Sequence, residues 1–175
     1  ILVPKSKKNK IKNVSCYDPS AGSGSLLMSL SHNIGASKCS IYSQDISQKS
    51  SDLLRLNLII NSLVHSIQNV IQGNTILNPY HKEKENLKKF DYIVSNPPFN
   101  MNFSDYREEL FTDENQARFF AGIPKVPPKK KDDMPIYQLF IQHILFSLSS
   151  DGKAAIVVPT GFLTGAGIDE KIRKL

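Results

Sequence analysis

Short apolar runs alternate along the chain with longer segments whose apolar residues recur at helical spacing. The first run, 14–17, ends at a polar turn rich in glycine, and apolar residues between 26 and 34 then repeat with the period of a helix. Further short runs bounded by turn residues predict strands at 39–42, 67–71, 92–94 and 154–158. The pattern is therefore strand, turn, helix, repeated along the chain.

Two more helices follow from their start signals. Ser47 is a suitable cap for a helix whose apolar residues continue to Leu63, and Pro135 fits the first turn of a helix that runs through Leu148. Strands alternating with amphipathic helices predict an α/β fold, a mainly parallel sheet with helices on both faces. Right-handed crossovers then bring every strand-to-helix turn to the same edge of the sheet, where ligands bind in such folds.

Residues 100–133 do not follow this pattern. The segment has no clean periodicity, and it contains five aromatic residues beside basic ones: Phe103, Tyr106, Phe111, Phe119 and Phe120, with Arg107, Arg118 and lysines at 129–131. Long connections of this kind are usually functional or mobile. Such aromatic residues can stack on bases while the basic residues pair with phosphates, but a loop that packs its own aromatic side chains remains an equal alternative.

Composition narrows the class of protein. The 175 residues are 40% hydrophobic and 22% charged, as expected of one globular domain spanning residues 1–175. No apolar run approaches the roughly 20 residues of a membrane helix, so we expect no membrane association. The two cysteines lack C-x-x-C spacing and the four histidines lack ligand spacing, so we expect no metal and a reducing cytoplasm. The net charge of +6, with lysines clustered at 5–12, 82–89 and 125–131, suits a polyanionic partner, although such clusters are usually plain surface.

The glycine-rich turn, residues 18–24 (DPSAGSG), follows the first strand. Gly22 and Gly24 permit backbone conformations closed to other residues and a close approach to a ligand. Asp18 would repel a phosphate but suits a cation, such as the α-ammonium group of a methionine moiety. Neither G-x-G-x-x-G nor a P-loop lysine is present, which argues against a dinucleotide or a nucleoside triphosphate. A purely structural turn remains an alternative.

Polar residues also follow the second and third strands. Asp45 comes 21 residues after Gly24, where an acid in these folds typically accepts hydrogen bonds from ribose hydroxyls. Asn74 and Thr75 follow the third strand and can reach an adenine ring, or they can simply shape a turn. Together with the glycine-rich turn, these residues predict a ligand that bears adenosine and a positively charged tail.

The sharpest feature is residues 96–99 (NPPF), directly after the fourth strand. Two successive prolines hold the backbone stiff, so the side-chain oxygen of Asn96 and the carbonyl of Pro97 can face one spot without reorganising. An amino group placed there donates both hydrogens, and its lone pair points toward an incoming electrophile. Phe99 offers a face on which a flat ring can stack.

These motifs, in this order, resemble the class I S-adenosylmethionine-dependent DNA adenine-N6 methyltransferases, which have a Rossmann-like fold. Within that class, the segments 117–124 (ARFFAGIP), 140–145 (FIQHIL) and 151–159 (DGKAAIVVP) resemble the modification subunit of type I restriction-modification systems. The resemblance implies methyl transfer from S-adenosylmethionine to an adenine flipped out of double-stranded DNA. It also implies partners: a DNA specificity subunit, a restriction subunit and a second copy of the modification subunit.

The resemblance also implies roles for single residues. The methionine part of the cofactor is expected at Asp18, Ser20, Gly22 and Gly24, its ribose at Asp45, and its adenine near Asn74 and Thr75. The target base is expected at the catalytic residues Asn96, Pro97 and Phe99. The family usually has an acid in place of Asn74. Segments that the family carries before the glycine-rich strand and after the helix at Ile168 are not in this sequence, so we expect a piece of a longer protein, truncated at both ends.

Two alternatives remain at this point. The same Asn-Pro-Pro-aromatic element can act on another planar nitrogen, such as a guanine amino group in RNA or a glutamine amide in a protein. The chain can also be an inactive fragment that only binds cofactor or takes part in assembly.

Overall fold

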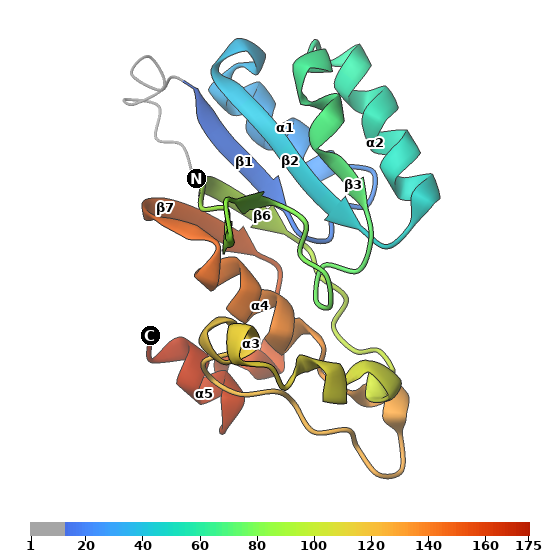
Figure 1. The fold of residues 1–175 in the computed structure, drawn as a ribbon, viewed down its shortest axis with the longest axis vertical. Helices are drawn as coiled ribbons and strands as arrows, with labels where there is room; N and C mark the ends of the chain where they lie inside the picture. Colours follow the sequence, from blue (N-terminus) through green and yellow to red (C-terminus); the bar gives the residue numbers. More distant parts are fainter. Residues whose placement is uncertain (1–12) are drawn as a thin grey trace. The chain divides into compact units, whose positions relative to one another are not determined.

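The computed structural model describes residues 13–175 of the chain (Figure 1). The chain divides into two compact units. One consists of the chain up to Asn96 with Ser147–Ile156, and the other of Pro97–Phe146 with Val157–Leu175. The single catalytic domain over residues 1–175 stays a prediction, and the predicted lysine cluster at 5–12 lies outside the described residues.

The first unit is built on a sheet of five strands in the order β3-β2-β1-β6-β7. The strands are β1 (Val14–Asp18), β2 (Cys39–Asp45), β3 (Val70–Gln72), β6 (Phe90–Ser95) and β7 (Leu148–Ile156). All neighbouring strands run parallel. The strand order reverses between β1 and β6, because the chain first moves outward from β1 to β3 and then from β6 to β7. The predicted parallel sheet is confirmed, and its switch point lies between β1 and β6.

Helices α1 (Ser25–Ile34) and α2 (Gln48–Ile60) share one hydrophobic core with the sheet (Figure 1). Buried side chains of both helices, among them Leu27 and Leu54, pack with Cys16 of β1 and Ile41 of β2. The predicted cap of α2 is confirmed, because the Ser47 hydroxyl accepts a hydrogen bond from the backbone N–H of Ser50 at 3.2 Å. Such a cap stabilises a helix by about 1 kcal/mol.

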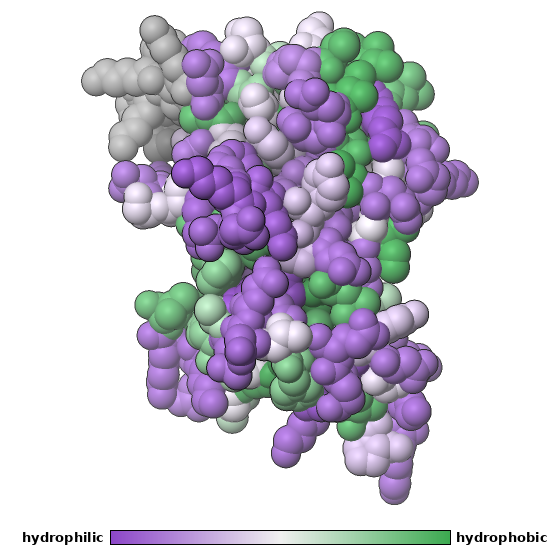
Figure 2. Space-filling view, viewed as in Figure 1, coloured by the Kyte–Doolittle hydropathy of each residue, from purple (hydrophilic) through white to green (hydrophobic). Residues whose placement is uncertain are grey.

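The connector between β3 and β6 packs on side chains of the other face of β1 and β2. Tyr17 stacks on Phe90 with ring centroids 4.3 Å apart, and His81 of the connector meets Tyr17 and Tyr42 edge-on. The lysine-rich part of this connector forms an antiparallel hairpin of two short strands, β4 (Lys82–Glu83) and β5 (Asn86–Leu87). Figure 2 shows a hydrophilic surface over this hairpin. The sequence does not predict the hairpin.

The predicted strand at 67–71 is largely wrong. Most of it belongs to a 3-10 helix at Val64–Asn69, and only β3 is extended. The cause is a set of contacts with β2: the buried Ser66 hydroxyl accepts the N–H of Ile41 at 2.9 Å, and the Asn69 side chain donates to the carbonyl of Ile41 at 3.0 Å. Side chains therefore satisfy backbone groups of β2 that strand pairing would otherwise satisfy.

The second unit is mainly helical. It contains α3 (Asp113–Arg118), α4 (Tyr137–Phe146) and α5 (Ile168–Arg173), and short 3-10 turns at Ser104–Tyr106, Glu108–Leu110, Lys131–Asp133 and Thr160–Leu163. The helix predicted from Pro135 is confirmed as α4, but it ends at Phe146, and Leu148 is the first residue of β7. The buried Asp169 carboxylate ties α5 to α4, because it accepts hydrogen bonds from the Tyr137 hydroxyl at 2.9 Å and from Gln138 Nε2 at 2.8 Å. Among residues 13–175, no helix has the length and apolar character needed to cross a membrane.

Candidate functional site

Polar residues gather where β1, β2 and β6 end, on both sides of the switch point. Asp18 is the last residue of β1, Asp45 is the last residue of β2, and Asn96 directly follows β6. Gly73 follows β3, and its N–H donates to the carbonyl of Asp45 at 2.8 Å. The predicted arrangement of these residues at one edge of the sheet is therefore present in the structure.

The glycine-rich turn is held by Asp45. One carboxylate oxygen of Asp45 accepts the N–H of Gly22 at 2.8 Å, and the other accepts the N–H of Ser47 at 2.8 Å. Gly22 and Gly24 have φ angles of 52° and 83°, in the left-handed region that favours glycine. The two glycines differ in their surroundings. A Cβ atom at Gly24 would lie 2.2 Å from Cδ1 of Leu54, whereas a Cβ atom at Gly22 would meet no atom within 4 Å.

Gly24 is therefore required by the packing of the turn against α2. Gly22 is not required by packing, and open space lies beside it. Backbone that is left-handed and uncovered is suited to a close approach by a ligand. The structure thus gives Gly24 a packing role, and the binding role of both glycines stays a prediction.

Asp18 is almost completely buried, at 1% exposure, and its carboxylate accepts the N–H of Ser20 at 3.0 Å. Burial raises the pKa of the Asp18 carboxyl from 3.8 to about 7, and the nearby Asp45 carboxylate adds to this rise. Hydrogen bonds from Ser20 and Ser95 act in the opposite direction. A cation bound beside such a buried carboxyl stabilises its charged form and lowers its pKa. This is the kind of ligand group that the sequence predicts there.

A hydrogen bond links the glycine-rich turn to the strand that carries the Asn-Pro-Pro-Phe element. The hydroxyl oxygens of Ser20 and Ser95 lie 2.8 Å apart, and Ser95 is completely buried. Asn96, the next residue, is exposed, and among residues 13–175 no group is hydrogen-bonded to its side chain. Phe99 is 38% exposed. The fold therefore anchors the end of β6 and leaves the amide of Asn96 available to a ligand.

The side chains of Asn74 and Thr75 already make hydrogen bonds within the protein, which the sequence does not reveal. The side-chain oxygen of Asn74 accepts the N–H groups of Ile76 at 3.0 Å and Leu77 at 3.2 Å, which fixes the turn after β3. The buried hydroxyl of Thr75 donates to the carbonyl of Pro19 at 2.7 Å. Both residues thus shape the loops around the glycine-rich turn.

Two residues of this edge have no predicted site role. Ser95 joins the two central strands, and the buried Gln44 braces the connector by accepting the N–H of Tyr80 at 3.0 Å and donating to the carbonyl of Asn78 at 2.8 Å. In the sequence each stands directly before a predicted site residue. A polar residue at the end of an apolar strand is the sequence signal for a side chain that holds neighbouring loops by hydrogen bonds.

Residues 100–133 divide into buried and exposed aromatic side chains. Phe103 and Phe119 are each 4% exposed. The Phe103 ring lies 5.4 Å from that of Tyr106, and the Arg118 guanidinium lies 4.3 Å from the centre of the Phe119 ring, contacts that agree with a loop that packs its own aromatic side chains. Tyr106, Phe111 and Phe120 are between 39% and 56% exposed. The segment therefore combines a packed interior with exposed rings.

Comparison with known proteins identifies the family. Residues 2–175 match the family described as N-6 DNA Methylase. The chain belongs to this family. Over 176 residues it is 30% identical to the methylase subunit of the type I restriction enzyme MpnII from Mycoplasma pneumoniae, which covers 96% of this chain and 31% of that protein. It is also 30% identical to the MjaIX methylase subunit from Methanocaldococcus jannaschii, over 94% of this chain and 28% of that protein.

Solved structures agree on the fold of this chain. The methyltransferase subunit of a type I restriction-modification system from Streptococcus thermophilus matches with a TM-score of 0.72 at 23% identity, covering 93% of this chain and 33% of that one. TrmN from Thermus thermophilus matches with a TM-score of 0.55 at 17% identity, covering 95% and 38%. The predicted Rossmann-like methyltransferase fold is confirmed. The chain spans about a third of the length of these relatives.

Proposed function

We propose that the complete protein transfers a methyl group from S-adenosylmethionine to the N6 amino group of adenine in DNA, as the modification subunit of a type I restriction-modification system. The chain would provide part of the catalytic domain. Membership of the N-6 DNA Methylase family and the two type I methylase subunits at 30% identity support this proposal.

The observation that carries the proposal is the position of Asn96. It follows a central strand at the switch point, it is exposed, and the buried Ser20–Ser95 hydrogen bond fixes the backbone just before it. In the proposed reaction the Asn96 side-chain oxygen and the Pro97 carbonyl accept the two hydrogens of the adenine amino group. The nitrogen lone pair is thereby directed at the methyl carbon, and Phe99 stacks on the flipped base. S-adenosylmethionine would supply the methyl group at this nitrogen, its sulfur would leave as a neutral thioether, and the proton displaced from the nitrogen would pass to water.

The residues at the neighbouring strand ends fit the cofactor. The buried Asp18 carboxyl would pair with the α-ammonium group, and Gly22 would let the chain approach it. Asp45 uses one lone pair on each oxygen for Gly22 and Ser47, and a carboxylate has about four acceptor positions. It can therefore still accept from ribose hydroxyls. When bound, S-adenosylmethionine supplies an activated methyl group on sulfonium sulfur.

Asn74 departs from the acid that the family usually has. Because its oxygen already accepts two N–H groups, we propose that the loop it shapes, together with Thr75, borders the adenine of the cofactor. The proposed partners are the specificity and restriction subunits, a second modification subunit and duplex DNA with a flipped adenine. We further propose a cytoplasmic location, where a restriction-modification complex would meet its DNA substrate.

The test is Asn96→Ala in the complete protein assembled with its specificity subunit. Labelled methyl transfer to adenine in DNA should fall by a factor of about 100 or more, because preorganised acceptors at a reacting group contribute on that order. Cofactor affinity by calorimetry should stay within about twofold, since Asn96 contacts the target only. Asn100→Ala is the matched control, because Asn100 is an exposed asparagine outside the four-residue element, and it should leave transfer nearly unchanged.

The same assay addresses the alternatives. Wild-type protein that methylates RNA or a protein glutamine, and not DNA, would contradict the proposed substrate. Wild-type protein that binds cofactor without any transfer would favour the inactive-module alternative.

A further inference from the structure

The connection between α3 and α4 contains a basic loop that has no role in the proposed reaction (Figure 1). This loop, residues 124–134, is called the lysine loop here, since it holds four lysines and two aspartates. All four lysines are exposed: Lys125, Lys129, Lys130 and Lys131. Lys130 lies 3.8 Å from Asp133, but both side chains are more than half exposed, so this ion pair is weak. Within residues 13–175, the other three ammonium groups make no hydrogen bond or ion pair.

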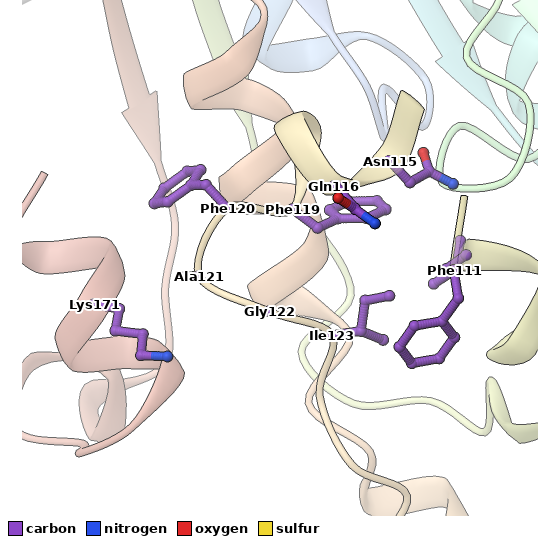
Figure 3. A pocket seen from close by; sticks show the side chains of 10 residues that line it. Phe111, Asn115, Gln116, Phe119, Phe120, Ala121, Gly122, Ile123 and Lys171 are labelled. Atoms are coloured by element: carbon purple, nitrogen blue, oxygen red, sulfur yellow. The ribbon is translucent and has the colours of Figure 1, made fainter. Parts of the chain in front are cut away.

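The lysine loop is distinct from the hollow that precedes it in the chain. Ala121, Gly122 and Ile123 line a hollow of about 300 Å³ together with aromatic side chains (Figure 3). Lys171 is the one charged residue among those that line it. The lysines that a polyanion requires are therefore on the loop and not in the hollow.

The rest of the long connection offers little positive charge. Arg118 is 1% exposed. Arg107 donates from Nε to the carbonyl of Pro124 at 3.0 Å and pairs with Glu108 at 2.9 Å, so it fixes the start of the lysine loop. Residues 105–114 hold five acidic residues and one arginine. A polyanion is therefore attracted to the lysine loop and repelled by the segment at 105–114.

The carboxyl end of the lysine loop is fixed beside Phe99, the residue on which the flipped base is proposed to stack. The carbonyl of Met134, which is completely buried, accepts the N–H of Met101 at 3.1 Å. The N–H of Tyr137 donates to the carbonyl of Phe99 at 3.4 Å. Two successive prolines, at 127–128, restrict the backbone within the loop. The loop therefore holds its lysines on a fixed base next to the proposed contact for adenine.

We propose that the lysine loop binds the DNA phosphates that flank the target adenine. Lys131 precedes Met134 by three residues, which span at most about 11 Å of chain. A duplex carries one phosphate charge per about 1.7 Å of its axis, so phosphates next to a base at Phe99 lie within the range of the loop. The lysines hold the backbone while the base leaves the stack, and they read no sequence. The inference rests on the proposed function, because it takes Phe99 as the contact for the target base.

The test uses the complete protein assembled with its specificity subunit. The variant Lys129→Gln/Lys130→Gln/Lys131→Gln removes three positive charges from exposed positions. The logarithm of DNA affinity falls linearly with the logarithm of salt concentration, and each phosphate contact contributes about 0.9 to the slope. Loss of the contacts should therefore reduce the slope by about 2 to 3. The KM for DNA should rise and kcat at saturating DNA should be retained, since phosphate contacts act equally in the ground state and the transition state.

Two control variants accompany this measurement. Replacing the same three lysines by arginine keeps the charge and should keep the wild-type slope. Lys84→Gln/Lys153→Gln/Lys171→Gln removes three charges from exposed lysines outside the loop, and it should also keep the wild-type slope. An unchanged slope in the loop variant, or an equal decrease in the variant outside the loop, would overturn the inference.

A second measurement locates the contact. Neutral methylphosphonate linkages beside the methylated adenine should weaken DNA binding by the wild type and have little effect on the loop variant, which already lacks the lysines. Equal weakening of both proteins would contradict the proposed position of the loop. Methyl transfer by the wild-type complex is read separately. Its absence in a complex that binds DNA would count against the proposed function, whereas the salt slopes test the lysine loop without any methyl transfer.

Discussion

Replacing the buried carboxyl of Asp18 by an amide tests the electrostatics of the candidate cofactor site. The substitution is Asp18→Asn. Asparagine keeps an oxygen that accepts the N–H of Ser20, as Asp18 does at 3.0 Å. The Ser20 hydroxyl donates to this same oxygen, and the NH₂ group on the other side of the amide can donate to the Ser95 hydroxyl. The change therefore removes the charge and retains most of the local geometry.

The expected effect on stability follows from the pKa of Asp18, which burial raises from 3.8 to about 7 in the folded chain. The folded state holds this proton more tightly than the unfolded state, so the wild type loses stability relative to Asp18→Asn as pH rises from 3.8 toward 7. The slope is about 1.4 kcal/mol per pH unit, and the total is at most about 4 kcal/mol. Above the folded pKa the difference should stay constant.

Urea denaturation of both proteins at intervals from about pH 5 to pH 9 measures this difference directly. The stability of Asp18→Asn relative to wild type should rise by about 2–3 kcal/mol between pH 5 and pH 7 and then level off. In the complete protein, wild-type affinity for S-adenosylmethionine should increase over the same range, while that of Asp18→Asn should be weak and independent of pH. A stability difference that does not change with pH would refute the assignment of a raised pKa to this carboxyl.

Three further predictions concern the glycines of the turn, the hydrogen bond of Thr75 to this turn, and the binding of duplex DNA. Gly24→Ala should lower stability by about 1–3 kcal/mol because its Cβ would lie 2.2 Å from Leu54, whereas Gly22→Ala should cost about 1 kcal/mol and mainly weaken cofactor binding. Denaturation and calorimetry separate the two effects. Thr75→Val should cost about 1–3 kcal/mol by leaving the Pro19 carbonyl without its 2.7 Å bond, while Thr75→Ser should retain most of the stability. This chain alone should bind duplex DNA weakly, with little sequence preference and a steep salt dependence in anisotropy measurements; a salt-insensitive preference for one duplex would contradict this.

The central strands and their polar ends are predictable from the sequence because each signal is local. An apolar run that stops at Asp18, Asp45 or Asn96 marks both the strand and the residue that projects beyond it. The segment at 67–71 shows where local signals fail. Its apolar residues are compatible with a strand, but the Ser66 and Asn69 side chains bind the backbone of Ile41 on β2. That competition depends on a contact between distant parts of the chain.

For the aromatic segment at 100–133, the sequence leaves two interpretations open for a related reason. The sequence places Arg107 and Arg118 beside phenylalanines, and this composition is typical of nucleic-acid contacts. Composition does not reveal that Arg118 is buried or that Arg107 is tied to Pro124 and Glu108. Once these two charges are turned inward, the exposed charge of residues 105–114 is acidic.

Some residues of the candidate site maintain its conformation through hydrogen bonds, and others have polar groups that can still bind a ligand. Thr75 and the Asn74 oxygen are used by neighbouring backbone groups, so substitutions there should act first on the shape of the loops. Asn96 has no such partner within residues 13–175, and Asp18 is buried beside a second acid, so substitutions there should act first on binding or chemistry. Asp45 belongs to both groups, because each of its oxygens holds one N–H and keeps acceptor capacity. A loss of cofactor binding in an Asp45 variant therefore reports on ribose recognition only if the conformation of the glycine-rich turn is shown to be intact.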